Sequence, residues 1–220
     1  NVFTRIQKKQ LAVSIKPQMV EKIPLVHHGS VREVLHRINP ENSSRIMEKL
    51  GLTPVAEREL KQLSGGELQK VAIAAAALKN ADTYFIDEPS SYLDIRERLR
   101  VAGFIRELAG EEKSVLTVEH DLVLLDFLSD TIHLMFGEPA VFGVVSAPHP
   151  TREGINTYLE GYARDENYRF RDQPLRFMEK GGREYKKQQS LLSWPAFTIK
   201  QGTFTLNVEA GKLLTSQSIG

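Results

Sequence analysis

The chain has 220 residues, of which 41% are hydrophobic, enough for one large packed domain or for one domain with attached pieces. Its 29 basic and 28 acidic residues nearly cancel, so the bulk charge identifies no class of partner. It has no cysteine, which excludes disulfides and cysteine-ligated metal sites within these residues. No apolar run comes near the ~20 residues that cross a bilayer. Together these features predict a cytoplasmic chain without a membrane partner.

The first part of the chain predicts one strand followed by three helices. In order, these are a strand at residues 11–15 and helices at 31–38, 43–50 and 64–78. Asn39-Pro40 separates the first two helices, and Gly51 suits the position just past the second. The third helix is apolar nearly all round, so we expect it to be buried.

The next part alternates short apolar strands with helices. We expect strands at 83–87 and 114–118, helices at 94–108 and 122–128, and a strand pair at 131–136 and 140–145. Asp94 and Glu97 have the spacing of a capping box, and Gly110 follows the helix that they begin. This alternation predicts an α/β domain built on a parallel sheet.

The character of the chain changes near Thr151. Residues 164–187 mix charge, aromatic residues and the pair Gly181-Gly182, which is typical of a hinge. Its eight basic residues are Arg164, Arg169, Arg171, Arg176, Lys180, Arg183, Lys186 and Lys187, against five acidic ones. From Trp194 the pattern favours a hairpin that opens a second domain. We therefore expect a partial domain at 1–150, a hinge at 151–190 and the start of another domain at 191–220, with both ends cut from a longer protein.

Ser64-Gly65-Gly66-Glu67 begins the buried helix and favours phosphate binding. Glycines let backbone N–H groups approach an anion, and the helix dipole adds positive potential there. The alternative is structural, because Ser-x-x-Glu is also a capping box that would only start the helix. Both interpretations stay open for this segment taken alone.

Asp87-Glu88 follows an apolar strand and predicts metal-assisted hydrolysis. Carboxylates at the carboxyl end of a strand lie where open α/β sheets bind ligands. We expect Asp87 to help hold Mg²⁺ and Glu88 to act as general base on a water molecule. An isolated Asp-Glu pair is usually a solvated turn, but the strand before it and Ser91-Tyr92-Leu93-Asp94 after it favour the functional interpretation.

Two further side chains are candidates for the same site. His120 follows the apolar strand 114–118 and suits a contact to a γ-phosphate that also links to Glu88. Gln18 lies in the turn after the first strand, from which its side chain would reach the metal or the water. A lone histidine or glutamine is more often structural, and their order along the chain is what favours a role.

These segments resemble the motifs of ATP-binding-cassette (ABC) ATPases. Gln18, Leu63-Ser64-Gly65-Gly66-Glu67, Tyr84 to Glu88, Ser91 to Asp94 and His120 resemble, in order, the Q-loop, signature, Walker B, D-loop and H-loop. Together with Arg152-Glu153-Gly154-Ile155-Asn156 and Glu166 to Arg171, they look like the first nucleotide-binding domain and hinge of subfamily E, the ribosome-recycling ATPases also called the RNase L inhibitor family.

The resemblance implies an incomplete P-loop-type ABC domain of a twin-cassette ATPase that binds ATP and Mg²⁺. Ser64, Gly65, Gly66 and Glu67 would bind the nucleotide of the other cassette, and Asp94 would couple the two sites. Gln18, Asp87, Glu88 and His120 would serve this cassette's own nucleotide. The implied partners are the second nucleotide-binding domain of the parent chain, the small ribosomal subunit, translation factors and ribosomal RNA at the hinge.

Two features of that family are missing from these residues. The phosphate loop G-x-x-x-x-G-K-[ST] occurs nowhere, so we expect the chain alone to hydrolyse ATP negligibly. The family's cysteine-rich iron–sulfur region is also absent, and its clusters are expected only in an N-terminal part of the parent protein. The remaining alternatives are an SMC-like DNA-associated ATPase head, a membrane-transporter cassette and a standalone remnant that acts as a binding module.

Overall fold

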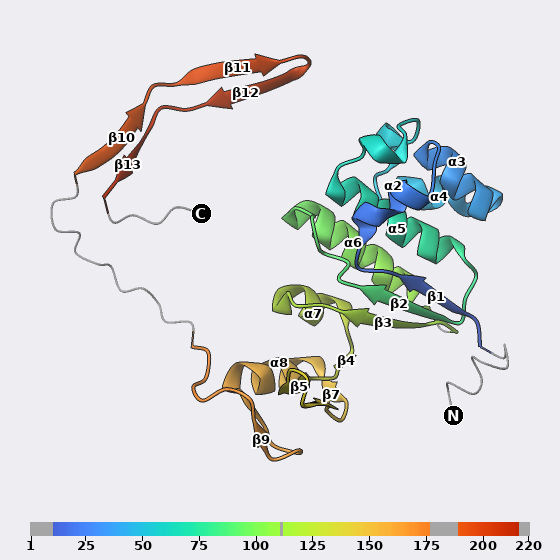
Figure 1. The fold of residues 1–220 in the computed structure, drawn as a ribbon, viewed down its shortest axis with the longest axis vertical. Coiled ribbons are helices and arrows are strands. Elements are labelled where there is room, and N and C mark those ends of the chain that lie inside the picture. The colour runs from blue at the N-terminus through green and yellow to red at the C-terminus, as the bar shows by residue number, and fades with distance from the viewer. Residues whose placement is uncertain (1–10, 111, 177–188, 216–220) are drawn as a thin grey trace. The chain divides into compact units, whose positions relative to one another are not determined.

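The computed structural model describes residues 11–110, 112–176 and 189–215. The chain divides into two compact units, Asn1–Leu175 and Arg176–Gly220 (Figure 1). The predicted hinge residues 177–188, with the basic Lys180, Arg183, Lys186 and Lys187, lie outside the described residues. Within the described ranges, no helix combines the length and the apolar character that crossing a bilayer requires.

A three-stranded parallel sheet organises the first unit. β1 (Val13–Lys16), β2 (Thr83–Asp87) and β3 (Ser114–Val118) lie in the order β1–β2–β3, and Figure 1 shows them side by side. In register, Ile15 pairs with Phe85 and Phe85 with Leu116. Because the strands are parallel, their carboxyl ends meet at one edge of the sheet. The α/β prediction is confirmed.

Helices and short 3₁₀ turns fill the chain between β1 and β2. They are η1 (Val20–Lys22), α2 (Ile23–Val26), α3 (Val31–Ile38), α4 (Pro40–Lys49), η2 (Thr53–Val55), η3 (Leu60–Gln62) and α5 (Gly65–Leu78). The sequence prediction started α4 at Ser43, which is wrong by three residues. Asn39 caps the helix by accepting a hydrogen bond from Asn42 N at 3.1 Å, and Pro40 occupies its first position. Gly51 adopts φ 63°, as a residue just past a helix end commonly does.

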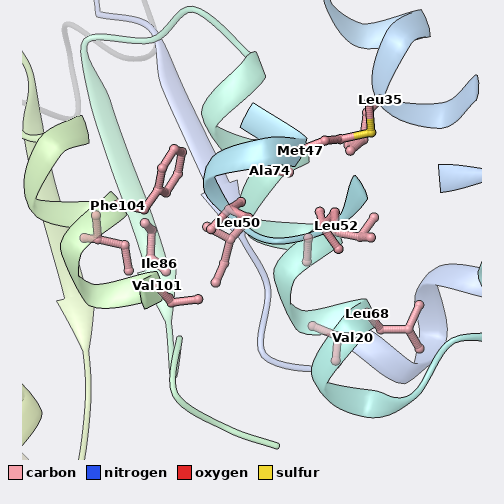
Figure 2. Close-up of a cluster of buried hydrophobic side chains, with 14 of the residues drawn as sticks. Val20, Leu35, Met47, Leu50, Leu52, Leu68, Ala74, Ile86, Val101 and Phe104 are labelled. Atoms are coloured by element: carbon pink, nitrogen blue, oxygen red, sulfur yellow. The ribbon is translucent and has the colours of Figure 1, made fainter. Parts of the chain in front are cut away.

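The core lies around α5, whose predicted burial is confirmed. Leu68, Val71, Ile73 and Ala74 of this helix are buried. Figure 2 shows the wider cluster, to which α4, β2 and α6 (Ile95–Leu108) contribute Met47, Ile86, Val101 and Phe104. Full burial of a large apolar side chain contributes about 1.5–3 kcal/mol, so this cluster fixes α5 and β2 relative to each other.

The elements after β2 continue the α/β alternation. α6 (Ile95–Leu108) and α7 (Leu122–Leu128) begin at the capping residues Asp94 and Asp121. The small strands that follow are β4 (Thr131–Ile132), β5 (Met135–Glu138), β6 (Phe142–Val145) and β7 (His149–Pro150). They are followed by α8 (Thr151–Glu160), β8 (Tyr162–Ala163) and β9 (Tyr168–Arg169).

The predicted strand at 131–136 is divided in the structure. β4 pairs with β7, whereas β5 pairs with β6 in the expected hairpin. At the break, Leu134 N donates to Ser146 Oγ at 2.9 Å instead of to the carbonyl of Ser146, its partner in the β5–β6 register. The bond from Ser146 N to the Leu134 carbonyl, at 2.8 Å, keeps that register, whereas the β4–β7 pairing beyond it is shifted by one residue.

The second unit consists, among its described residues, of two antiparallel strand pairs. β10 (Ser190–Trp194) pairs with β13 (Gly211–Leu214), and β11 (Phe197–Gln201) pairs with β12 (Phe204–Val208). Gly202 turns the β11–β12 hairpin at φ 60°, a conformation that glycine adopts without steric cost. The predicted hairpin is therefore present.

Candidate functional site

Glu88 is the centre of the candidate site. It follows β2 directly, and its backbone N–H donates to the Val118 carbonyl of β3 at 2.9 Å. Its φ is 45°, in the left-handed region that residues other than glycine rarely adopt. Such strained residues cluster at functional sites, where the surrounding structure holds them in place.

Three side chains from three different segments converge on the Glu88 carboxylate. Gln18 Nε2 donates to Oε1 at 2.8 Å, from the turn after β1. Ser91 Oγ donates to Oε2 at 3.1 Å, from the turn after β2. His120 Nε2 lies 3.2 Å from Oε1, from the loop after β3. The convergence follows from the parallel sheet, whose carboxyl ends share one edge.

Hydrogen bonding favours the ionised form of this carboxylate. The bond from Gln18 lowers the pKa of Glu88 below its usual value, with smaller contributions in the same direction from Ser91 and His120. Glu88 is therefore ionised at neutral pH, the state that can accept a proton from water. Nearby, burial raises the pKa of Glu119, which sits one residue before His120.

Two predicted metal ligands, Asp87 and Gln18, fit a weakly held Mg²⁺. Within the described residues, the Asp87 side chain has no hydrogen-bond partner, and the bond that Gln18 makes uses its nitrogen and leaves its amide oxygen. Mg²⁺ is commonly held by one or two protein oxygens together with water and phosphate oxygens. No group of three or more potential ligands from His, Cys, Asp and Glu occurs in the described ranges, so a metal here would need oxygens from phosphate or water.

The predicted phosphate-binding segment forms a capping box at the start of α5. Ser64 Oγ accepts from Glu67 N at 3.3 Å, and the Glu67 carboxylate accepts from Ser64 N at 2.7 Å and from Ser64 Oγ at 2.8 Å. The structural alternative for this segment is thus present in the molecule. It leaves the nucleotide contact of Ser64 and Glu67 as a prediction.

The glycines of that segment pack against the turn that follows Glu88. A Cβ on Gly66 would lie 2.8 Å from the Tyr92 carbonyl oxygen, and one on Gly65 would lie 3.2 Å from the Tyr92 ring. Asp94, two residues on, caps α6 by accepting from Glu97 N at 2.9 Å. Among the described residues, no hydrogen bond joins Ser64, Gly65 or Gly66 to the cluster around Glu88.

Sequence reasoning missed three residues that contact Glu88. Ser91 binds its carboxylate, and Lys16 and Gln69 donate to the backbone carbonyls of Asp87 and Glu88. Gln69 is a polar residue inside an otherwise apolar helix face, and that contrast was the available signal. For Lys16, the sequence offered no such signal beyond its position at the end of β1.

Comparison with known proteins identifies the family. A family profile described as ABC transporter matches residues 4–91. An uncharacterized ABC transporter ATP-binding protein of Methanocaldococcus jannaschii is 44% identical over 99% of this chain and 36% of its own length. Translation initiation factor RLI1 of Saccharomyces cerevisiae is 41% identical over 99% of this chain and 37% of its own length. The chain belongs to subfamily E of the ABC ATPases.

A solved structure of this subfamily agrees with the fold. The archaeal chain in a model of ribosome-bound Pelota and ABCE1 superposes with a TM-score of 0.90, at 48% identity, over 96% of this chain and 36% of its own. The present chain therefore spans little more than a third of the length of its subfamily E relatives. The ABC-domain fold expected from the sequence is confirmed.

Proposed function

We propose that these residues form the hydrolytic part of one cassette in a twin-cassette ATPase that acts on ribosomes. The observation that carries the proposal is the convergence of Gln18, Ser91 and His120 on the ionised Glu88 carboxylate at the sheet edge. The family supports ATP as the substrate. The relatives favour translation over the DNA-associated, transporter and binding-module alternatives, because matches covering nearly the whole chain include translation factors.

The geometry suggests a role for each side chain. Glu88 accepts a proton from water as the water attacks the γ-phosphorus and the bond to the leaving phosphate oxygen breaks. Gln18 orients Glu88 and, with Asp87, would hold Mg²⁺, whose charge stabilises the phosphate oxygens when it is bound. His120 links Glu88 to the γ-phosphate. Each group acts mainly by position, which is how phosphoryl transfer is usually catalysed.

The remaining predicted residues serve contacts between cassettes. Ser64, Gly65, Gly66 and Glu67 would face a nucleotide held by the second cassette, and Asp94 would lie beside them at the interface. Residues 1–150, 151–190 and 191–220 would be the partial first cassette, the hinge and the start of the second cassette. The hinge's arginines would meet ribosomal RNA, and the small subunit and translation factors would be the larger partners.

Ribosome association tests this proposal directly. The complete protein encoded by the reading frame that contains residues 1–220 is expected to sediment with small ribosomal subunits when a non-hydrolysable ATP analogue is present, and far less without nucleotide. Closure of the cassettes on ATP creates the binding surface, which is the reason for the difference. Sedimentation that does not depend on nucleotide would contradict the ribosomal part of the proposal.

The isolated chain is expected to turn over ATP negligibly. Without a G-x-x-x-x-G-K-[ST] loop among residues 1–220, no backbone cradle holds the β- and γ-phosphates against Glu88. Phosphate release by the purified chain measures this. A rate that disappears on Glu88→Gln would overturn the expectation, because the remaining residues would then suffice for hydrolysis.

A further inference from the structure

Two buried side chains donate hydrogen bonds to the same short stretch of backbone. Lys16 Nζ, from the end of β1, donates to the Asp87 carbonyl at 2.6 Å and lies 3.5 Å from the Glu88 carbonyl. Gln69 Nε2, from α5, donates to the Glu88 carbonyl. Both residues are 0% exposed. The backbone on each side of the Asp87–Glu88 peptide bond is thus fixed from two different elements.

Both donors are costly to bury, and packing alone does not explain them. A lysine is rarely buried completely unless it is paired, and Lys16 has no ion-pair partner among the described residues. Gln69 Oε1 is buried with no hydrogen-bond partner among the described residues. An apolar side chain at either position would avoid these costs.

The backbone that these donors hold is the strained part of the site. Glu88 adopts φ 45°, and this conformation aims its carboxylate at Gln18, Ser91 and His120. The side-chain contacts are themselves partly exposed, with the His120 side chain 79% exposed. Among the described residues, Lys16 and Gln69 are the buried side chains that hydrogen-bond to the backbone of this turn.

We propose that Lys16 and Gln69 are positioning residues that together hold the Asp87–Glu88 backbone in the conformation that presents the Glu88 carboxylate. Their effect on hydrolysis rests on the function proposed above, whereas their effect on the conformation of Glu88 does not. Gln69 is also on the helix that begins at the Ser64-Gly65-Gly66 segment. A shift of α5 therefore reaches Glu88 through a single hydrogen bond.

The test replaces each donor by an apolar side chain of similar length, Lys16→Met and Gln69→Met, in the complete protein. Turnover at this site alone is measured in a single-site background, in which the second cassette's acid equivalent to Glu88 is replaced by Gln. We expect kcat to fall between about tenfold and a hundredfold with KM for ATP nearly unchanged, because misplacing a reacting group by about 1 Å has effects of this size. Crystal structures of the variants should show Glu88 leaving positive φ and losing its contact to Gln18.

Ser14→Ala is the matched control. Ser14 is also buried on β1, but its hydroxyl donates to the Ala76 carbonyl of α5 at 2.8 Å, and its register partner is Tyr84 rather than the Asp87–Glu88 turn. The variant should lower thermal stability while leaving kcat and the Glu88 backbone unchanged. Loss of kcat in Ser14→Ala as large as in Lys16→Met would assign the effect to general destabilisation and overturn the proposal.

The readouts separate this inference from the proposed function. Glu88 retained at positive φ in both methionine variants would overturn the positioning role, whatever the turnover. A second outcome separates the two proposals. If Glu88 is displaced in the methionine variants but Glu88→Gln does not change turnover, the proposed function is contradicted and the positioning role is supported. Should Lys16→Met fail to fold, Gln69→Met decides the question by the same two measurements.

Discussion

Replacing Glu88 by Gln is expected to lower kcat for ATP at this site by at least about a hundredfold, the range typical of a lost general base. Glutamine has almost the same shape and can still meet Gln18, Ser91 and His120, but it cannot accept a proton at neutral pH. The wild-type carboxylate can, because it is ionised at neutral pH, and the hydrogen bond from Gln18 favours that form by lowering the pKa of Glu88. KM for ATP should change little, since the substitution leaves binding groups in place.

Phosphate release in the single-site background measures this effect. Glu57→Gln is the matched control, because Glu57 is an exposed acid whose partner is Arg32 on the surface of the same unit, 2.6 Å away. That variant should keep the wild-type rate. An unchanged kcat in Glu88→Gln would show that another group activates the water, and the role of Glu88 would then be limited to holding Gln18 and His120.

The arrangement of this site could be predicted from the sequence because each candidate residue comes just after one strand of the parallel sheet. Each of Gln18, Glu88 and His120 follows an apolar strand, and a parallel sheet brings such positions to one edge without further information. The sequence therefore predicted that His120 lies near Glu88, and the two are 3.2 Å apart. The catalytic roles of these residues stay predictions, because position alone does not establish them.

The parts that escaped prediction depend on tertiary contacts. A lysine at a strand end and a glutamine in a helix have many ordinary explanations, and only the packing of β1 and α5 against β2 shows that both reach one turn. The division of the strand at 131–136 was missed for a similar reason. Its cause is Ser146, a residue twelve positions from Leu134 that replaces a ladder bond with a side-chain bond.

The signature segment illustrates two roles carried by one pattern. The capping box at Ser64 and Glu67 accounts for the start of α5 but gives no reason for two consecutive glycines, since most residues fit the first turn of a helix. The glycines are explained by Tyr92, whose carbonyl oxygen and ring occupy the space that side chains at Gly66 and Gly65 would fill. The segment is therefore packed onto the turn that connects Glu88 to Asp94.

Replacing Gly66 by Ala should for that reason disable the signature segment. The new Cβ would lie 2.8 Å from the Tyr92 carbonyl oxygen, a backbone atom that cannot rotate away. Moving it displaces Leu93, which is buried, and with it Asp94 at the start of α6. Overpacking of this kind costs about 1–3 kcal/mol of unfolding free energy. A displacement near 1 Å at a reacting site reduces turnover by about a hundredfold.

ATP turnover of Gly66→Ala is measured in the complete protein that also carries Glu88→Gln. In that background the remaining turnover comes from the nucleotide held by the second cassette, which is the nucleotide that Gly66 is proposed to contact. Gly103→Ala is the matched control, because Gly103 lies within α6 and a Cβ there meets no atom within 4 Å. That variant should keep turnover and raise the unfolding free energy by about 0.5–1 kcal/mol, since alanine favours the helix interior. If Gly66→Ala kept both turnover and stability, the turn at Tyr92 would have to be free to move, and the signature segment could not be rigidly coupled to Asp94 and Glu88.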